Sequence, residues 1–196
     1  MSGARSKVYL VRHGETAWTI SRQATGRTDI PLTDQGERDA QKLSTRLKGL
    51  GFAAVLTSPL QRAQRTSELA GFGDRAEVDV DLMEWDYGAY EGRRAAEIQA
   101  ERPGWSLFKD GCPGGETLEA VRVRAERVVN RIRALQGDVL VFAHWHILRV
   151  FTARWLDLPA VEARRFYLTT ASLSILGYDH DLDEPVITLW NDARHP

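Results

Sequence analysis

Two short apolar runs, each followed closely by a histidine, place the strongest constraint on how this chain folds. They are residues 8–11, before His13, and residues 139–143, before His144. Almost continuous apolar runs of this length are typical of strands that are covered on both faces, as in a parallel sheet. Residues 53–57 form a third such run. Because helical patterns separate these runs, the sequence predicts an α/β fold with a mainly parallel central sheet and helices on both faces.

Apolar residues recur at helical spacing between the predicted strands. One stripe lies within residues 40–50 and a longer one within residues 118–135. The segment Ser58-Pro59-Leu60-Gln61 has a capping-box pattern with proline at the first helical position, which predicts a helix from residue 59 to residue 70. Two further strands are expected at residues 173–178 and 186–190, and an antiparallel arrangement of these last strands stays open.

The composition favours one globular domain that spans residues 1–196. The chain has a mass of 22.1 kDa, with 43% hydrophobic and 27% charged residues, which is enough for a core but short for two ordinary domains. With 26 basic and 27 acidic side chains, the formal net charge is −1. No overall field therefore favours binding to nucleic acid or to an acidic membrane.

The cysteine content and the N-terminal segment bear on the compartment. Cys112 is the only cysteine, which excludes an internal disulfide and fits a reducing compartment. It has no cationic neighbour in sequence, and we interpret it as a turn residue rather than a nucleophile. The apolar run after Met1–Lys7 is too short for a signal peptide or a membrane span. The expected location is therefore cytoplasmic, without membrane association.

Polar residues at three strand-to-helix junctions are the main functional clue. In sheets of this class, ligands bind beyond the carboxyl ends of the strands, and His13, Arg62 and His144 are expected there. Arg62 lies near a predicted helix N-terminus, where a cation is unfavourable without an accompanying anion. It is either a phosphate ligand or a surface arginine paired with a glutamate. His13, before Gly14, either faces a pocket or is hydrogen-bonded within the core.

Two further groups have chemical interpretations. His144 and His146 alternate, as two metal ligands on one strand would, but no third ligand stands at a recognisable spacing, and His146 is expected to begin the following helix. Glu84 lies in an aromatic-rich loop, where burial against the rings is expected to raise its pKa and make it a proton donor. Asp86 and Glu91 are competing carboxylates in the same loop.

Taken together, a series of short motifs resembles the histidine phosphatase superfamily, also called the phosphoglycerate mutase-like family. The motifs occur in the family's order and are Arg12-His13-Gly14-Glu15-Thr16, Thr25-Gly26, Ser58-Pro59-Leu60-Gln61-Arg62-Ala63, Glu84, Pro113-Gly114-Gly115-Glu116 and Ala143-His144. The match runs from Val8 to about Ser174. The resemblance implies a three-layer α/β/α sandwich and a mechanism through phosphohistidine that uses no metal and no other cofactor.

The resemblance also assigns roles to individual side chains. It implies that His13 is the nucleophile that accepts the phosphoryl group and that Glu84 is the proton donor. It places Arg12, Arg62 and His144 around the phosphate. Phosphoryl transfer needs in-line positioning and charge stabilisation, which these groups supply. The substrate-binding residues expected are Arg12, Thr19, Thr25, Gly26, Arg62 and Trp145.

Two positions depart from the family pattern. Many members have asparagine where this chain has Thr19, and glycine where it has Trp145. The hydroxyl of Thr19 can still hydrogen-bond a phosphate. Because Trp145 puts the largest side chain where glycine is usual, we expect it to line and narrow the substrate pocket.

The short segment between Glu84 and Pro113 bears on the reaction. Phosphoglycerate mutases of the family carry a long insertion after the acid glutamate that helps to close the site, so a short segment predicts a pocket open to water. We therefore predict a phosphomonoester hydrolase of the histidine acid phosphatase type that acts on small phosphorylated metabolites. The alternatives are a cofactor-dependent phosphoglycerate mutase and, because of Trp145, a non-catalytic phospho-ligand binding module. Family analogy and the apolar C-terminal strands favour a homodimer.

Overall fold

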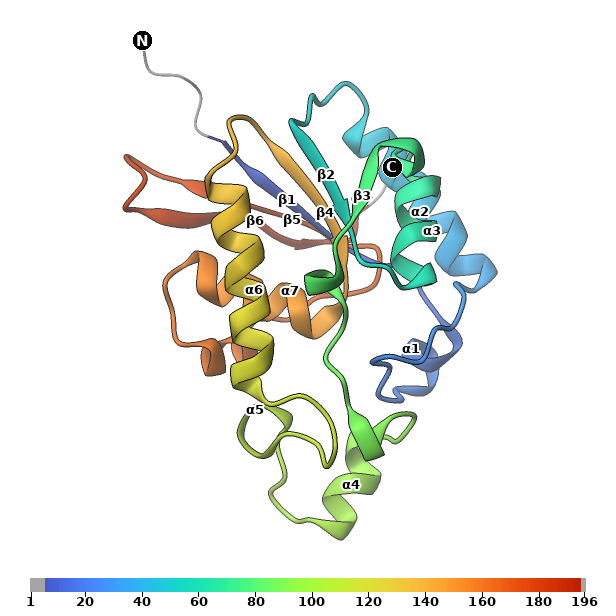
Figure 1. Cartoon of the computed structure of the whole chain (residues 1–196). Coiled ribbons are helices and arrows are strands. Elements are labelled where there is room, and N and C mark those ends of the chain that lie inside the picture. The colour runs from blue at the N-terminus through green and yellow to red at the C-terminus, as the bar shows by residue number, and fades with distance from the viewer. Residues whose placement is uncertain (1–5, 195–196) are drawn as a thin grey trace.

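The computed structural model describes residues 6–194 (Figure 1). The expectation drawn from the N-terminal segment rests partly on residues 1–5, which lie outside the described residues. Within the described part, no helix combines the length and the apolar character that crossing a membrane requires.

A central six-stranded sheet organises the molecule. The strand order is β3-β2-β4-β1-β5-β6. Pairing is parallel from β3 through β2 and β4 to β1, and antiparallel from β1 through β5 to β6, which confirms the mainly parallel sheet and settles the direction of the last two strands. The strands are β1 (Val8–Arg12), β2 (Ala54–Thr57), β3 (Ala76–Val78), β4 (Val139–Ala143), β5 (Leu173–Tyr178) and β6 (Pro185–Asp192).

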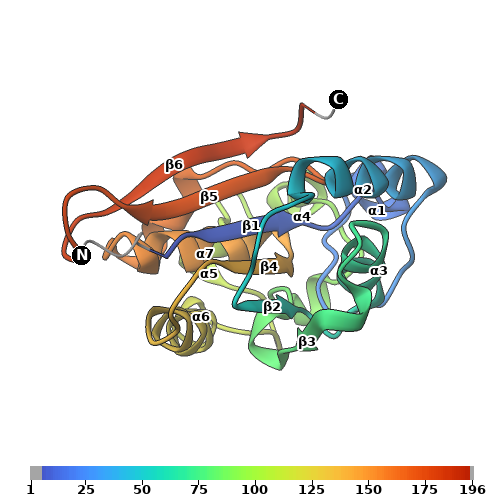
Figure 2. The ribbon, with the colours of Figure 1, turned by 90° about the horizontal axis from the view of Figure 1, so that it is seen from above.

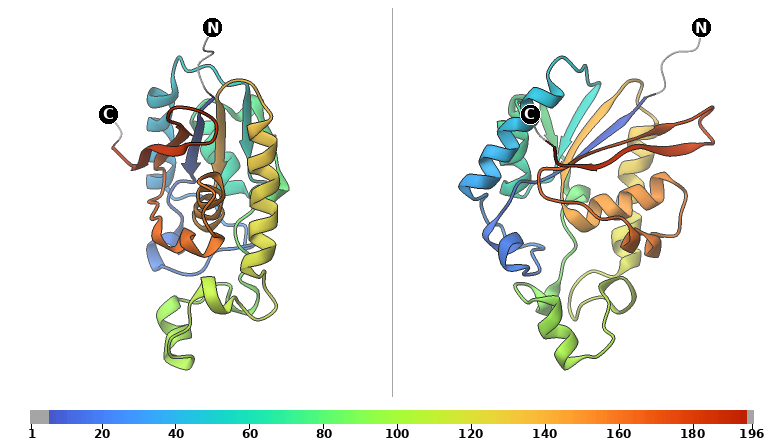
Figure 3. Two further views of the ribbon diagram at one scale, coloured as in Figure 1. Left: turned by 90° about the vertical axis from the view of Figure 1, so that its left-hand side faces the viewer. Right: turned by 180° about the vertical axis from the view of Figure 1, so that it is seen from behind.

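Helices cover both faces of the sheet and make the three-layer arrangement that the sequence predicts. They are α1 (Ala17–Ser21), α2 (Asp34–Leu47), α3 (Gln61–Leu69), α4 (Ala95–Glu101), α5 (Leu107–Asp110), α6 (Leu118–Arg133) and α7 (Trp145–Trp155). Figures 2 and 3 show α2 and α3 on one face and α6 and α7 on the other. Figure 1 shows α1, α4 and α5 in the half of the molecule toward which the parallel strands run.

The continuous apolar runs arise because successive strand residues enter two different cores. Leu10 and Val141 belong to the core beneath α6 and α7, whereas Tyr9 and Phe142 belong to the core beneath α2, with Leu43. Side chains alternate across a strand, so a strand buried on both faces needs an apolar residue at every position.

The start of one helix differs from the prediction. Helix α3 begins at Gln61 instead of residue 59, and its N-cap Leu60 makes no side-chain cap hydrogen bond. The predicted capping box at Ser58 is therefore wrong, because the hydroxyl of Ser58 pairs instead with Nε2 of His144 at 2.7 Å. Helix α2 begins earlier than its apolar stripe, since the Thr33 side chain caps it by accepting the Gly36 N–H.

The sheet register brings the two histidine segments together. Strands β1 and β4 are neighbours, with Arg12 opposite Ala143. The N–H of His13 donates to the Ala143 carbonyl at 3.0 Å, and the N–H of Ser58 donates to the Phe142 carbonyl at 3.0 Å. The residues that follow β1, β2 and β4 therefore meet at one edge of the sheet, as expected for an α/β protein.

Candidate active site

His13 is a buried, neutral imidazole with one nitrogen committed to the backbone. Its Nδ1 lies 2.7 Å from the carbonyl oxygen of Gly14, so Nδ1 carries the proton and donates it. Burial lowers the pKa of His13 well below its ordinary value, and Arg62 and Arg12 lower it further. Nε2 therefore keeps its lone pair at neutral pH, which is the state that a nucleophile needs.

His144 lies beside His13, and both of its ring nitrogens are hydrogen-bonded. The two ring centres are 5.1 Å apart. Nε–H of Arg62 donates to Nδ1 of His144 at 3.2 Å, so the proton of the neutral ring sits on Nε2 and is donated to Ser58. Burial lowers the pKa of His144 well below its ordinary value, and the Arg62 charge adds to the effect.

The guanidinium of Arg62 is fully buried and largely occupied by protein groups. Besides His144, it donates to the carbonyls of Thr28 and Gly26 at 2.9 Å and of Thr25 at 3.3 Å. The segment of residues 25–28 therefore wraps the arginine with backbone oxygens. Of the two interpretations of Arg62 left open by the sequence, the surface arginine is excluded.

Glu91 holds that segment in place from the other side. Its Oε1 accepts the N–H of Gly26 at 2.7 Å and the N–H of Thr28 at 3.1 Å. A Cβ atom added to Gly26 would come within 2.7 Å of Oε2 of Glu91 and 2.4 Å of a backbone oxygen, so no larger residue fits there. From the sequence, Glu91 was only a carboxylate that competes with Glu84 for the role of proton donor. The residues next to Glu91 in the sequence do not indicate its hydrogen bonds to Gly26 and Thr28.

Glu84 binds the N-terminus of α7. Its carboxylate accepts N–H groups of Trp85 at 2.9 Å, His146 at 2.9 Å and Ile147 at 3.1 Å. Burial alone raises the pKa of a carboxyl, but hydrogen bonding to His146 outweighs it and lowers the pKa of Glu84 well below its ordinary value. The expectation of a raised pKa for Glu84 is therefore wrong, because three backbone donors stabilise the ionised form.

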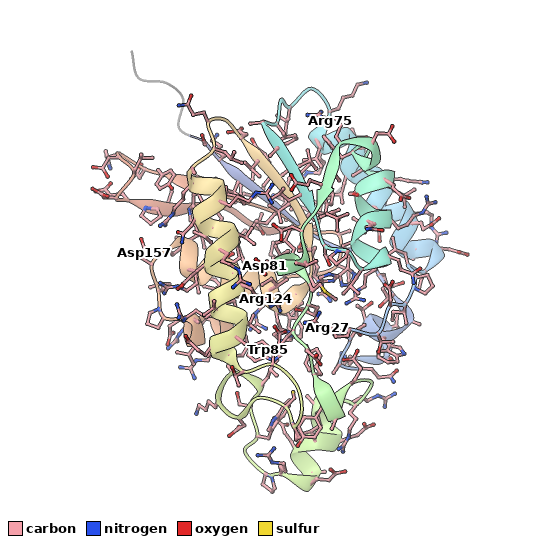
Figure 4. All side chains as sticks on the ribbon, viewed as in Figure 1. Arg27, Arg75, Asp81, Trp85, Arg124 and Asp157 are labelled. Atoms are coloured by element: carbon pink, nitrogen blue, oxygen red, sulfur yellow. The ribbon has the colours of Figure 1, made fainter. Side chains whose placement is uncertain are left out.

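An arginine on α6 positions the chain segment that carries Glu84. Arg124 is buried and makes two hydrogen bonds to the carboxylate of Glu116, at 2.9 and 3.0 Å, while its Nη1 donates to the Asp81 carbonyl at 2.8 Å. Figure 4 shows Arg124 with Asp81 and Trp85 along the same side of α6. The indole N–H of Trp85 donates to the Glu116 carbonyl at 2.9 Å.

Arg12 offers an unused donor at the same edge. Its Nη1 donates to the Leu168 carbonyl at 2.6 Å, whereas its buried Nε has no acceptor among the residues that the structure describes. Burial lowers the pKa of Arg12 to about 10, so the side chain is still cationic at neutral pH. A buried donor without an acceptor is costly, and an oxyanion beside Arg12 would satisfy it.

Trp145 lies between two guanidinium groups. The Arg12 group is 5.5 Å and the Arg149 group 4.8 Å from its ring centre, distances at which cation–π attraction operates. Its Nε1 is likewise buried without an acceptor in the described part of the chain. Trp145 is also the first residue of α7, so it forms the wall next to Glu84.

The two alternate histidines do not point to a common metal site. His146 is the second residue of α7, and its Nδ1 lies 2.7 Å from the hydroxyl of Tyr87, whereas the ring of His144 is used by Arg62 and Ser58. Within residues 6–194, the one group with metal-binding geometry is an exposed set on the turn between β5 and β6, namely Asp179, His180 and Glu184.

Cys112 does not join this chemistry. It is buried, and burial raises the pKa of its thiol to about 12. The thiol is protonated at neutral pH and is a poor nucleophile.

A cavity of about 650 Å³ opens onto these groups. Of the site residues predicted from the sequence, six line it, namely Arg12, His13, Thr19, Thr25, Glu84 and Trp145. Arg62 and His144 are fully buried and contact His13 or its neighbours without lining the cavity. The Thr19 hydroxyl donates to the Thr16 carbonyl at 2.8 Å, so it would have to rotate to donate to a ligand.

This arrangement defines a class of site: a pocket that combines a buried, neutral histidine with cationic side chains, built at the carboxyl edge of a parallel sheet. The model of the histidine phosphatase superfamily (branch 1) matches residues 8–193. The chain belongs to this superfamily, which confirms the resemblance seen in the motifs.

Similar proteins carry names that fit this class. The chain is 40% identical to an acid phosphatase of Mycobacterium tuberculosis, with 89% of this chain and 87% of the relative covered. It is 36% identical to a sedoheptulose 1,7-bisphosphatase of Saccharomyces cerevisiae, with 96% and 94% covered. It is also 36% identical to a protein of Cronobacter sakazakii named probable phosphoglycerate mutase GpmB, with 88% and 85% covered.

A solved structure supports the same fold assignment. The open reading frame Rv3214 of Mycobacterium tuberculosis superposes with a TM-score of 0.89 at 35% sequence identity, covering 95% of this chain and 97% of the other. The three-layer fold is therefore shared over nearly the whole chain.

Proposed function

We propose that the chain, acting as one domain, is a metal-independent phosphomonoesterase that works through a phosphohistidine on His13. The observation that carries the proposal is the 2.7 Å hydrogen bond from Nδ1 of His13 to the Gly14 carbonyl. It leaves Nε2 as the lone-pair nitrogen of a residue that lines the cavity. A neutral imidazole held in this way attacks phosphorus directly, so the protein needs no metal-bound nucleophile.

The reaction has two displacement steps. In the first, Nε2 of His13 forms a bond to phosphorus, the ester P–O bond breaks, and the leaving oxygen takes a proton. In the second, water attacks the phosphohistidine, the P–N bond breaks, and inorganic phosphate leaves. Arg12 contributes its free Nε donor to the transferred group, while the buried positive charge of Arg62 adds electrostatic stabilisation.

Glu84 is the proposed proton donor, and its ionised resting state is compatible with that role. A phosphate bound beside it carries negative charge, and a like charge raises the pKa of a carboxyl. Substrate binding as a monoanion therefore delivers both the charge that raises the pKa of Glu84 and the proton that the leaving oxygen needs. After the first step the carboxylate is again ionised and can accept the proton of the attacking water.

Hydrolysis is favoured over phosphoryl return to substrate. The relatives named acid phosphatase and bisphosphatase support it, and the cavity is wide enough to hold water beside the phosphohistidine. The relative named phosphoglycerate mutase supports a second candidate, a cofactor-dependent mutase.

One experiment separates these functions. Phosphate release from a panel of phosphomonoesters, including 3-phosphoglycerate, is measured in EDTA for the wild type, His13→Ala and the control His180→Ala. His180 is exposed on the β5–β6 turn, so its variant should behave as the wild type. Release that survives EDTA and disappears only in His13→Ala supports the phosphatase. Isomerisation of 3-phosphoglycerate well above phosphate release, after priming with bisphosphoglycerate, would support the mutase instead.

A further inference from the structure

The cavity is far larger than a phosphate group requires. Its volume of about 650 Å³ falls within the range of pockets that enclose whole organic ligands. His13 and Glu84 lie in the wall of the same cavity. In the proposed reaction His13 attacks phosphorus and Glu84 donates a proton to the leaving oxygen. The rest of the cavity then surrounds the leaving group.

One wall of that remaining space is aromatic and aliphatic, while polar residues such as Arg22, Gln23 and Ser106 also line the cavity. The wall is formed by segments far apart in the sequence, with Trp18 from α1, Ile98 from α4, Trp105, Leu107 and Phe108 from the α5 region, and Tyr167 from the loop before β5. Trp105, Leu107 and Phe108 are nearly inaccessible to solvent, whereas Tyr167 is 61% exposed and stands at the rim. Figure 1 shows α4 and α5 beneath the carboxyl edge of the sheet, where they can close this side.

Ring packing and a hydrogen bond hold the aromatic wall in place. Trp105 packs edge-on against Tyr90 with ring centres 5.5 Å apart, and its indole N–H donates to the Gly111 carbonyl at 2.9 Å. Phe108 packs edge-on against Trp85 at 5.5 Å and carries the Arg149 guanidinium 5.0 Å from its ring centre. A preformed wall of this kind binds a flat apolar group without a large ordering cost.

Two polar groups at the Trp105 side of this wall are already used. The indole N–H of Trp105 is bound to Gly111, and Nε2 of Gln99 donates to the Trp105 carbonyl at 3.3 Å. A polyhydroxylated leaving group placed against the rings of Trp105 and Phe108 would lose water from the hydroxyls that face them without gaining hydrogen bonds there, which is unfavourable. An aromatic leaving group has no such loss and gains stacking and apolar burial.

We infer that this wall is a leaving-group subsite for a planar aromatic ring system. The inference rests on the proposed phosphatase function and deepens it: the preferred substrate is a phosphomonoester whose alcohol carries one or two flat rings. The phosphate occupies the end with His13 and Arg12, and the rings lie against Trp105 and Phe108.

The test keeps the chemistry of the leaving group constant. Ethyl phosphate, phenylethyl phosphate and naphthylethyl phosphate all release a primary alcohol of similar acidity, so differences in kcat/KM report on binding of the rings. We expect kcat/KM to rise by roughly tenfold with each added ring in the wild type. Equal values for the three esters would overturn the subsite while leaving the phosphatase function intact. Absence of hydrolysis of every ester would overturn the phosphatase function and the subsite together.

Two variants locate the effect. Tyr167→Ala removes an exposed ring at the rim and should fold normally, and Phe108→Leu removes a ring from the wall while keeping apolar volume. Both should reduce the ratio of naphthylethyl to ethyl phosphate kcat/KM by at least about threefold. Leu182→Ala, at a position 68% exposed and outside the cavity, is the control. If the naphthylethyl to ethyl phosphate ratio is unchanged in both variants, the rings of the substrate do not bind this wall and the inference is overturned.

Discussion

The hydroxyl of Tyr87 lies 2.7 Å from Nδ1 of His146, and the same nitrogen is 3.7 Å from Oε2 of Glu84. Burial raises the pKa of Tyr87 well above its ordinary value, and the Glu84 charge adds to the effect, so the phenol is protonated. Burial lowers the pKa of His146. Tyr87 therefore donates to a neutral ring, and the proton of His146 sits on Nε2, in a residue that lines the cavity.

Tyr87→Phe should remove the donor that sets this tautomer. The buried Nδ1 of His146 then lacks a partner, which costs about 1–3 kcal/mol in the free energy of unfolding. Urea denaturation measures that loss. Tyr167→Phe, which deletes the hydroxyl of an exposed tyrosine, should leave the free energy of unfolding unchanged; an equal loss in both variants would contradict the role assigned to the Tyr87 hydroxyl.

Glu91 supports the site through the segment that wraps Arg62. Glu91→Ala leaves the N–H groups of Gly26 and Thr28 without their shared acceptor, so kcat/KM should fall by roughly tenfold to a hundredfold as Arg62 loses its fixed position. Glu91→Gln keeps one oxygen as the acceptor and should retain most of the activity. If the glutamine variant is as impaired as the alanine variant, the carboxylate charge matters rather than the hydrogen bonds.

Glu84→Gln tests the proton donor separately from binding. The amide keeps an oxygen for the backbone donors of α7 but cannot exchange a proton, so kcat for alkyl phosphates should fall by about 10² to 10⁴. For p-nitrophenyl phosphate, whose leaving group needs no proton, the first step should be far less affected. A pre-steady-state burst of nitrophenol checks this. Equal loss with both kinds of ester would argue against Glu84 as the acid.

Because the pKa values of His13 and His144 are lowered, activity and stability should respond differently to acid. His13 is neutral in the folded protein below the ordinary histidine pKa of about 6.5, so kcat/KM should persist when the pH falls below that value. The unfolded chain binds protons on His13 and His144 in this range while the folded chain does not, so the free energy of unfolding should decrease as the pH falls below about 6.5. Kinetics and urea denaturation at several pH values check both trends. A loss of kcat/KM through pH 6.5 in protein that is still folded would mean that His13 titrates normally.

Trp145 should influence which substrates are preferred. Trp145→Gly removes the ring that stacks on Arg12 and opens the cavity wall next to Glu84, so relative kcat/KM values across a series of phosphomonoesters should change. Trp145→Phe keeps a ring and should preserve the order of preference. Unchanged relative rates in the glycine variant would show that Trp145 does not line the part of the pocket that substrates contact.

The strands of the sheet could be read from the sequence because burial on both faces leaves a continuous local signal. Residues 139–143 and 173–178 coincide with β4 and β5. Helices α4 and α5 were not predicted, since they are short and are held by distant aromatic contacts such as the one between Tyr90 and Trp105. Such helices depend on tertiary packing more than on their own pattern.

The residues of the site could be predicted from the sequence, but the hydrogen bonds that they make could not. The motifs identified His13, Arg62 and Glu84, but the aromatic neighbours of Glu84 suggested a raised pKa. The opposing donors come from His146 and Ile147, more than sixty positions away. Hydrogen bonds between residues so far apart in the sequence produce no local pattern from which they could be predicted. For the same reason, the hydrogen bond between Glu91 and Gly26 could not be predicted.

The carboxylate of Glu84 at the start of α7 has a consequence for product inhibition. The first N–H groups of a helix attract anions, and here the chain fills that position with its own carboxylate rather than leaving it to phosphate. A phosphate released by the proposed reaction would therefore not be held by these N–H groups at the start of α7. Its escape is opposed by fewer donors, which helps an open hydrolase to turn over while its product accumulates.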